Sequence, residues 1–167
     1  RFPVRAPSAY VARMRRGAAD DPLLRQVAAD PREDQVVQGY ATDPLEERAA
    51  MPVPGLLHKY AGRALLTLTG ACAIHCRYCF RRHFAYAEAS PTGQHWPRVL
   101  EYLASHAEIT EIILSGGDPL TLATAKLRRS IADLAALPAL TRLRIHTRMP
   151  VVEPARLDAA LRDCLGS

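Results

Sequence analysis

The sequence predicts an α/β fold that is built from repeated strand–helix units and preceded by a helical segment. Short apolar runs of strand length recur at residues 64–69, 111–115 and 143–147, as expected of buried strands in a parallel sheet. Stretches of helical length separate these runs, and polar or glycine-rich loops follow them. Regular alternation of strand and helix indicates βαβ units on one parallel sheet.

Size and composition fit one folded domain. The chain has 167 residues, of which 49% are hydrophobic, enough to bury roughly 70% of the surface that an unfolded chain exposes. The sequence has no leading apolar stretch with a cleavage site and no apolar run of about 18 residues that could span a bilayer. We therefore expect a cytoplasmic protein without a membrane partner.

The charge pattern does not favour nucleic-acid binding. The net charge is +5, from 22 basic and 17 acidic side chains, and such an excess can indicate an anionic partner. These charges are scattered along the chain rather than massed in one block. Nearly all the basic residues are Arg, whose planar fork suits carboxylates and phosphates.

Residues 1–51 differ from the rest in composition and predict a helical extension. They are rich in Ala, Arg and Asp, and contain three Asp-Pro pairs at Asp21-Pro22, Asp30-Pro31 and Asp43-Pro44. In each pair the acid can cap a helix whose first turn accommodates the proline. The turn-rich run 51–55 then predicts a stiff connector, and we place a domain boundary between residues 51 and 52.

Residues 52–167 predict the N-terminal half of a (βα) barrel. The expected order is strand 64–69, a cysteine-rich loop, helix 97–106, strand 111–115, helix 123–137, strand 143–147 and a helix opened by Pro154. Such units can close into a barrel whose functional loops lie beyond the carboxyl ends of the strands. A complete eight-unit barrel takes about 250 residues, so the fold class is α/β with a partial barrel.

The strongest chemical signal is a group of three cysteines in the loop after the first predicted strand. Cys72, Cys76 and Cys79 have C-x3-C-x2-C spacing, whereas Cys164 stands alone and is expected in a helix core. This layout is a poor disulfide framework, and closely spaced thiolates from one loop suit an iron–sulfur cluster. Three ligands on a [4Fe-4S] cluster leave one iron open for a substrate or cofactor.

A structural zinc site is the main alternative interpretation of these cysteines. It would be completed by His58, His75 or His83. Zinc knuckles favour paired C-x2-C units, however, and a second pair is absent from the sequence. The corresponding non-enzymatic alternative is a zinc-binding interaction module.

The cysteine motif resembles that of the radical S-adenosylmethionine (SAM) superfamily, including the aromatic Tyr78 before the third cysteine. The resemblance implies that SAM chelates the open iron and that its reductive cleavage gives a 5′-deoxyadenosyl radical. The second predicted strand ends in a segment that looks like the superfamily's glycine motif near the SAM amino group, Ser115-Gly116-Gly117-Asp118. Glycines permit close backbone approach to a ligand, and Asp118 could accept from an ammonium group.

A closer resemblance, from about Asp43 onward, is to lysine 2,3-aminomutases. Within them, Phe80, His83 and Phe84 are more similar to the branch that makes (R)-β-lysine for modifying elongation factor P. The resemblance implies a pyridoxal 5′-phosphate (PLP)-dependent isomerase in which a hydrogen leaves the β-carbon of L-lysine and the amino group moves from C2 to C3. It also implies elongation factor P modification enzymes as partners. A radical SAM enzyme without PLP remains an alternative.

The same resemblance assigns further site residues. The family's PLP-phosphate segment matches Lys59, Tyr60 and Arg63, and two cations that flank a Tyr hydroxyl suit a phosphate dianion. Arg81 matches the Arg that pairs with the substrate carboxylate. The PLP-anchoring lysine and the acids that bind the substrate's side-chain ammonium lie in the family's C-terminal part, beyond residue 167. We therefore predict that residues 1–167 alone do not turn over lysine.

Overall fold

The computed structural model describes residues 3–89, 91 and 95–166, and within them it contains one four-stranded sheet. The strands follow the order β1-β2-β3-β4 and span Leu56–Tyr60, Arg63–Thr69, Glu111–Gly116 and Arg142–Ile145. β2, β3 and β4 are parallel, with Leu66, Leu114 and Ile145 in register. The parallel βαβ units predicted from the sequence are confirmed, and the fold fits a partial (βα) barrel.

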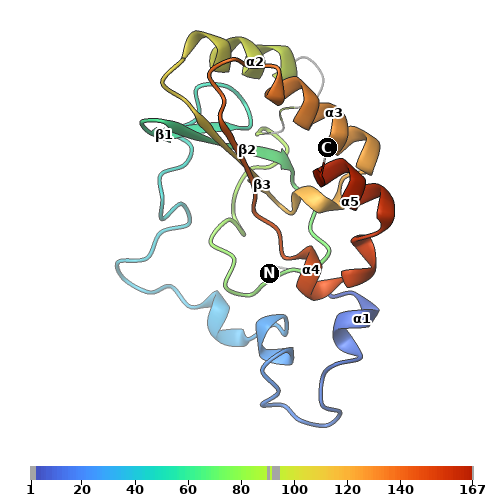
Figure 1. Ribbon diagram of the computed structural model, residues 1–167. Coiled ribbons are helices and arrows are strands. Elements are labelled where there is room, and N and C mark those ends of the chain that lie inside the picture. The colour runs from blue at the N-terminus through green and yellow to red at the C-terminus, as the bar shows by residue number, and fades with distance from the viewer. Residues whose placement is uncertain (1–2, 90, 92–94, 167) are drawn as a thin grey trace.

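Helices cover one face of this sheet. α2, His95–Ser105, joins β2 to β3, and α3, Thr124–Ala135, joins β3 to β4 (Figure 1). The chain ends with α4, Met149–Val152, and α5, Ala159–Gly166. The core between sheet and helices consists of fully or almost fully buried apolar side chains, namely Leu66, Ile112, Leu114, Val99, Leu103, Leu127, Leu134 and Leu161. On the opposite face of the sheet, Leu65 and Ile113 are only half-buried.

The strand β1 was not predicted from the sequence. Its presence makes the sheet mixed rather than purely parallel. β1 pairs antiparallel with β2 through a hairpin in which Tyr60 lies opposite Arg63. Gly62 turns this hairpin with φ of 78°, a left-handed value that glycine adopts without strain. Burial along β1 falls from two buried residues to two exposed ones instead of alternating, which explains why no strand pattern was visible in the sequence.

The predicted N-terminal helices are corrected to shorter elements. α1 is Ser8–Val11, and two single 3₁₀ turns follow at Leu24–Gln26 and Pro31–Asp34. Asp30 does cap the second of these turns, with Glu33 completing a capping box. No helix follows Asp43, whose carboxylate accepts from the backbone N–H of Glu47 at 3.0 Å within a turn. Of the three predicted starts, only Asp30 coincides with the cap of an element, and that element ends after one turn.

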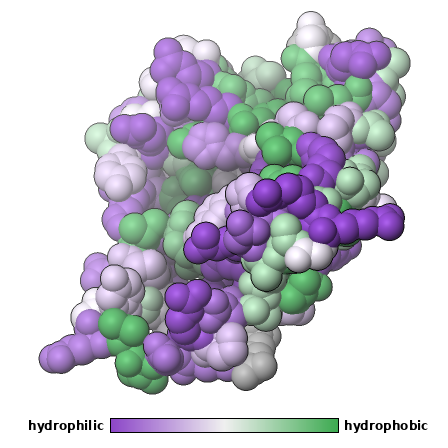
Figure 2. All heavy atoms as spheres, turned by 90° about the horizontal axis from the view of Figure 1, so that it is seen from below, coloured by the Kyte–Doolittle hydropathy of each residue, from purple (hydrophilic) through white to green (hydrophobic). Residues whose placement is uncertain are grey.

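The N-terminal segment packs against the rest of the molecule. Tyr10 of α1 is completely buried, and its hydroxyl donates to the carbonyl of Leu23. Arg13 donates to the carbonyl of Val151 in α4 at 2.6 Å. This segment forms the lower part of the molecule in Figure 1, and seen from below it presents hydrophilic and hydrophobic residues intermixed (Figure 2). The domain boundary after residue 51 stays a prediction.

Other element boundaries differ slightly from those expected. α2 begins at His95 rather than Pro97, and β4 ends at Ile145 instead of continuing to Thr147. Thr147 accepts from the backbone N–H of Met149 at 3.0 Å and so begins the next turn. Pro154 opens a 3₁₀ turn, Pro154–Arg156, and not the helix that was predicted there. None of the helices in the described part of the chain is long and apolar enough to cross a bilayer.

Candidate cluster and cofactor site

The three clustered cysteines lie in the loop that leaves the carboxyl end of β2. All three are half-buried free thiols, and the backbone N–H of Cys79 donates to the carbonyl of Cys76 at 3.0 Å. The N-terminal segment holds this loop from below, because Arg77 N–H donates to the carbonyl of Gln26 at 2.8 Å. The loop conformation is therefore fixed by a segment that is distant in sequence.

The thiols are close enough to influence one another. Burial raises the pKa of Cys72 to about 11, with smaller contributions from the negative charges of Asp118 and the other two thiolates. Burial also raises the pKa of Cys79. A cationic group must therefore compensate the thiolates if all three are to ionise. Three thiolates that share one partly buried loop fit a polynuclear iron–sulfur cluster, which supplies that positive charge.

The zinc alternative gains no support from the arrangement of nearby ligands. Among the described residues, no three His, Cys, Asp or Glu side chains converge around a single metal ion, and this applies to the three cysteines as much as to any set of cysteines and histidines. The Nδ1 atom of His58 pairs with the hydroxyl of Tyr102 at 2.9 Å. The Nδ1 atom of His75 pairs with the carbonyl of Pro3 at 3.0 Å. Each contact uses one ring nitrogen only, as is also usual for histidines that bind a metal through the other nitrogen.

The glycine motif at the end of β3 packs tightly against the start of the cysteine loop. A Cβ atom on Gly117 would lie 2.2 Å from the carbonyl oxygen of Ala71, and one on Gly116 would lie 2.6 Å from that of Thr69. The backbone N–H of Gly117 donates to Thr69 at 2.7 Å. Gly116 also has φ of 116°, which disfavours any side chain. These glycines therefore let two loops of the chain meet.

Asp118 is buried and its carboxylate is already engaged by the protein. It accepts from Leu120 N–H at 3.0 Å, from the Thr147 hydroxyl at 2.6 Å and from Arg148 N–H at 2.8 Å. These bonds cap the turn after β3 and tie it to the end of β4. Ser115, near the end of β3, is also buried, and it lies on the same face of the sheet as the half-buried Ile113. Asp118 thus has a structural role in positioning Arg148 beside the cysteines.

Arg148 reaches the cysteine loop from the end of β4. Its Nη1 atom donates to Cys76 Sγ at 2.7 Å, and its Nη2 atom donates to the side chain of Gln26. The guanidinium also lies 5.4 Å from the centre of the Tyr78 ring, which is largely exposed. A cation thus stabilises one of the thiolate positions.

A cavity of about 230 Å³ gathers the predicted phosphate and carboxylate ligands. Lys59, Tyr60, Arg63 and Arg81 all line it, together with the half-buried apolar face of the sheet. The Lys59 ammonium donates to the carbonyl of Leu45, and the Arg63 guanidinium lies 5.4 Å from the centre of the Tyr60 ring. Glu47 also lines the cavity and pairs with Arg81. Lys59 and Arg63 therefore supply the excess positive charge, which together with the Tyr60 phenol fits an anionic group such as a phosphate ester.

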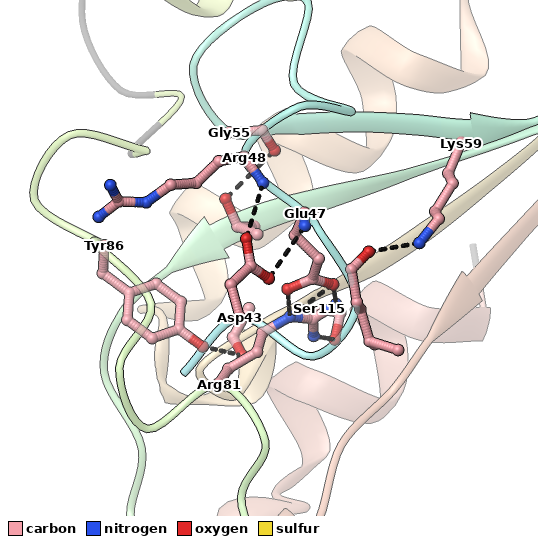
Figure 3. Close-up of polar contacts among 11 residues, drawn as sticks. Asp43, Glu47, Arg48, Gly55, Lys59, Arg81, Tyr86 and Ser115 are labelled. Atoms are coloured by element: carbon pink, nitrogen blue, oxygen red, sulfur yellow. Dashed lines mark hydrogen bonds and ion pairs between the residues drawn. The ribbon is translucent and has the colours of Figure 1, made fainter. Parts of the chain in front are cut away.

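Arg81 is held in this cavity by a buried carboxylate. Its Nε atom donates to Glu47 Oε2 at 2.8 Å, its Nη2 atom donates to Glu47 Oε1 at 2.6 Å, and both side chains are only 9% exposed. The pair lies beside Ser115, whose hydroxyl is 3.4 Å from Arg81 Nη1 (Figure 3). The ring of Phe80 covers the guanidinium at 4.8 Å.

Sequence reasoning missed several residues at this site. Glu47 belongs to an irregular loop, and no local pattern marks one acid of Glu46-Glu47 as buried. Arg148 falls within a segment that resembles the family, but without an assigned role. Tyr86, whose hydroxyl donates to the carbonyl of Gly116 at 2.6 Å, follows the cysteine motif, and burial raises its pKa. The only feature of the sequence that could have pointed to Tyr86 is that it is an aromatic residue shortly after the cysteine motif.

Comparisons with known proteins support one family. Residues 66–163 match the model described as the radical SAM superfamily. Proteins named L-lysine 2,3-aminomutase are similar over most of the chain: that of Escherichia coli is 50% identical over 163 residues, covering 98% of this chain and 47% of that protein. Those of Haemophilus influenzae and Clostridium subterminale are 46% and 34% identical, covering 93% and 87% of this chain and 46% and 35% of their own lengths.

The chain therefore spans about half the length, or less, of these curated relatives. The superfamily match covers more than half of the chain and contains all three clustered cysteines, the glycine motif and Arg148. The chain belongs to the radical SAM superfamily, and this membership implies a [4Fe-4S] cluster and SAM.

Proposed function

We propose that the full-length protein is a PLP-dependent L-lysine 2,3-aminomutase that converts L-lysine to (R)-β-lysine. The observation that supports this most directly is the cavity in which Lys59, Tyr60, Arg63 and Arg81 meet. The cysteine loop and the SAM site generate the radical, and a separate cation-lined cavity offers a place for further anionic groups, such as the PLP phosphate and the substrate carboxylate. The similarity to proteins named L-lysine 2,3-aminomutase agrees with this choice.

Within this proposal Cys72, Cys76 and Cys79 hold the cluster and leave one iron for SAM. The cluster and SAM supply a 5′-deoxyadenosyl radical, and PLP supplies covalent attachment of lysine and stabilisation of the radical. Ser115, Gly116 and Gly117 line the SAM side at the end of β3, and Tyr78 flanks the cluster. Asp118 acts there by positioning the loop, because its carboxylate already accepts from three donors.

The cation-lined cavity performs the binding steps. Lys59, Tyr60 and Arg63 bind the phosphate, and Arg81 binds the carboxylate of the amino-acid substrate. Planar guanidinium groups orient carboxylates through two parallel hydrogen bonds. Anchoring the phosphate and the carboxylate at separate residues would restrict the orientations that the bound substrate can adopt in the cavity.

The finer assignment is that the product serves elongation factor P modification in the cytoplasm. Its support is the resemblance of Phe80, His83 and Phe84 to that branch. The side chains of Phe80 and His83 line a small depression together with Asp43 and Arg81, so branch-specific residues lie next to the proposed substrate ligand. Clustered thiols that must stay reduced also agree with a reducing compartment.

The deciding experiment is anaerobic reconstitution of the full-length protein, followed by an assay for β-lysine from L-lysine, SAM and PLP. Equilibrium binding of PLP separates this proposal from a radical SAM enzyme that lacks PLP. We expect PLP binding to weaken strongly in Arg63→Ala and Tyr60→Ala. Absence of PLP binding to the reconstituted wild type would refute the proposal while leaving the superfamily assignment intact.

The proposal also predicts that residues 1–167 alone do not form β-lysine. The residues that attach PLP and bind the substrate's side-chain ammonium are expected beyond this chain. The same assay applied to residues 1–167, with confirmed iron loading, tests the point. Turnover by this segment would contradict the assignment of those roles to the remainder of the protein.

A further inference from the structure

We infer that Glu47 is a positioning residue for substrate recognition. It orients Arg81 so that one edge of the guanidinium faces an incoming carboxylate. This inference rests on the proposed function, since it takes Arg81 as the ligand of the substrate carboxylate. It adds a residue that neither the cysteine motif nor the glycine motif indicates, and it assigns the loop before β1 a part in substrate specificity.

The geometry of the ion pair leaves one edge of Arg81 available. A guanidinium has two edges that can bind a carboxylate through two hydrogen bonds: Nε with Nη2, and Nη1 with Nη2. Glu47 occupies the first edge, at 2.8 Å and 2.6 Å. Among the described residues, Nη1 has a hydrogen-bond contact only with the Ser115 hydroxyl, at 3.4 Å. The second edge therefore retains donors for another carboxylate.

Burial makes Glu47 necessary for this orientation. Both side chains of the pair are only 9% exposed. Leaving a buried guanidinium without an anionic partner strongly destabilises the folded protein. If the Glu47 carboxylate were absent, Arg81 would turn toward water or toward another anion in the same cavity. A phosphate bound by Lys59 and Arg63 is such an anion, because all these residues line one cavity. Glu47 thus holds Arg81 in the orientation in which it can bind the substrate carboxylate.

The loop that carries Glu47 is anchored at several points. The carboxylate of Asp43 accepts from Glu47 N–H at 3.0 Å and from Arg48 N–H at 3.4 Å (Figure 3). Lys59 of β1 donates to the Leu45 carbonyl, and His58 N–H donates to the Ala50 carbonyl at 2.8 Å. The position of Glu47 is therefore fixed relative to β1, which also contributes Lys59 and Tyr60 to the cavity.

The test compares two ligands that differ only at the carboxylate. Anaerobic calorimetry on the full-length holoenzyme, without SAM or reductant, gives dissociation constants for L-lysine and L-lysinamide. We expect Glu47→Gln to lower the preference for lysine over lysinamide about tenfold, as for loss of roughly 1.4 kcal/mol of charged hydrogen bonding. Glu47→Asp, which keeps the charge, should retain more of the preference than Glu47→Gln.

Glu111→Gln is the matched control. Glu111 is another buried glutamate on the same sheet, paired with Arg142 at 3.1 Å and Arg144 at 3.3 Å, and it does not line the cavity. We expect this change to leave the ratio of the two dissociation constants unaltered. An equal fall in both variants would show that Glu47 acts only through general stability, and would overturn the inference.

The remaining outcomes separate this inference from the proposed function. If Arg81→Ala abolishes the preference and Glu47→Gln leaves it unchanged, Glu47 has no positioning role and the proposed function stands. If Glu47→Gln increases the preference, Glu47 competes with the substrate, which also overturns positioning. If the wild type shows no preference for lysine, the assignment of Arg81 fails, and the inference fails with it.

Discussion

Arg148 donates a hydrogen bond to the sulfur of Cys76 at 2.7 Å, across 72 residues of sequence. The backbone N–H of Arg148 is held in turn by Asp118, at 2.8 Å. The end of β3, the end of β4 and the cysteine loop are thus joined through the backbone and side chain of one arginine. A positive charge at a ligating sulfur stabilises the more negative, reduced state of a cluster.

We therefore predict that Arg148→Leu lowers the midpoint potential of the cluster by on the order of 100 mV. A charged hydrogen bond contributes about 1.5–3 kcal/mol, and about 1.4 kcal/mol of preference for one redox state corresponds to about 59 mV for one electron. The measurement is a redox titration of the reconstituted protein followed by electron paramagnetic resonance. Arg162→Leu is the control, because Arg162 is exposed on α5 and its side chain bonds only the Leu157 carbonyl among the described residues. Equal potentials in wild type and Arg148→Leu would contradict the prediction.

Gly117→Ala should displace the cysteine loop and destabilise the fold. A Cβ atom at this position lies 2.2 Å from the Ala71 carbonyl oxygen and 2.7 Å from its carbon. Because these are backbone atoms, they cannot move aside as the end of a flexible side chain would. We expect a loss of about 1–3 kcal/mol in the free energy of unfolding, together with reduced iron content after reconstitution.

Gly166→Ala is a matched control for this change. A Cβ atom at Gly166 has no neighbour within 4 Å among the described residues, and Gly166 lies in α5. Alanine in a helix is favoured over glycine by up to about 1 kcal/mol, so this variant should be neutral or slightly more stable. Denaturant unfolding monitored by circular dichroism checks both. An unchanged Gly117→Ala protein would show that the two loops do not require contact.

Glu33 is expected to make the fold less stable as the pH falls into the acid range. Its carboxylate accepts from Arg77 and from Arg82, and the hydrogen bond from Arg77 is the main reason that its pKa falls from the usual 4.5 to about 2. A carboxyl whose pKa is lower in the folded state stabilises the fold above its unfolded pKa. This stabilisation is lost as the pH falls from about 4.5 toward 2.

Glu33→Gln should therefore flatten the stability curve of the apoprotein between pH 4.5 and 2. Some pH dependence will remain, because backbone N–H donors also lower the pKa of Asp21 and of Asp43. Urea unfolding at a series of pH values provides the measurement. If wild type and variant lost equal stability across this window, the ion pairs of Glu33 would not be present in the folded protein.

The parallel part of the fold was predictable because its signals are local. β2 and β3 are continuous apolar runs between loops, so length and composition identify them without knowledge of their partners. β1 was missed because its pattern of burial follows the hairpin with β2 rather than alternation along its own sequence. At the N-terminus, Asp30 showed where an element begins, but nothing local showed that it ends after one 3₁₀ turn.

In the candidate site, too, local features were predictable from the sequence and long-range contacts were not. The spacing of Cys72, Cys76 and Cys79 is a local feature and was sufficient to predict a cluster. The contacts of Arg81 with Glu47 and of Arg148 with Cys76 join residues 34 and 72 positions apart. Such contacts follow from how the barrel strands and the N-terminal segment pack, which no single stretch of sequence contains.

Iron and sulfide analysis of the full-length protein, purified and reconstituted without oxygen, tests the central claim most directly. We expect about four irons and four acid-labile sulfides per chain, and loss of both when Cys72, Cys76 or Cys79 is replaced by Ala. A colourless protein that contains zinc and no sulfide, with all three replacements without effect on metal content, would contradict it.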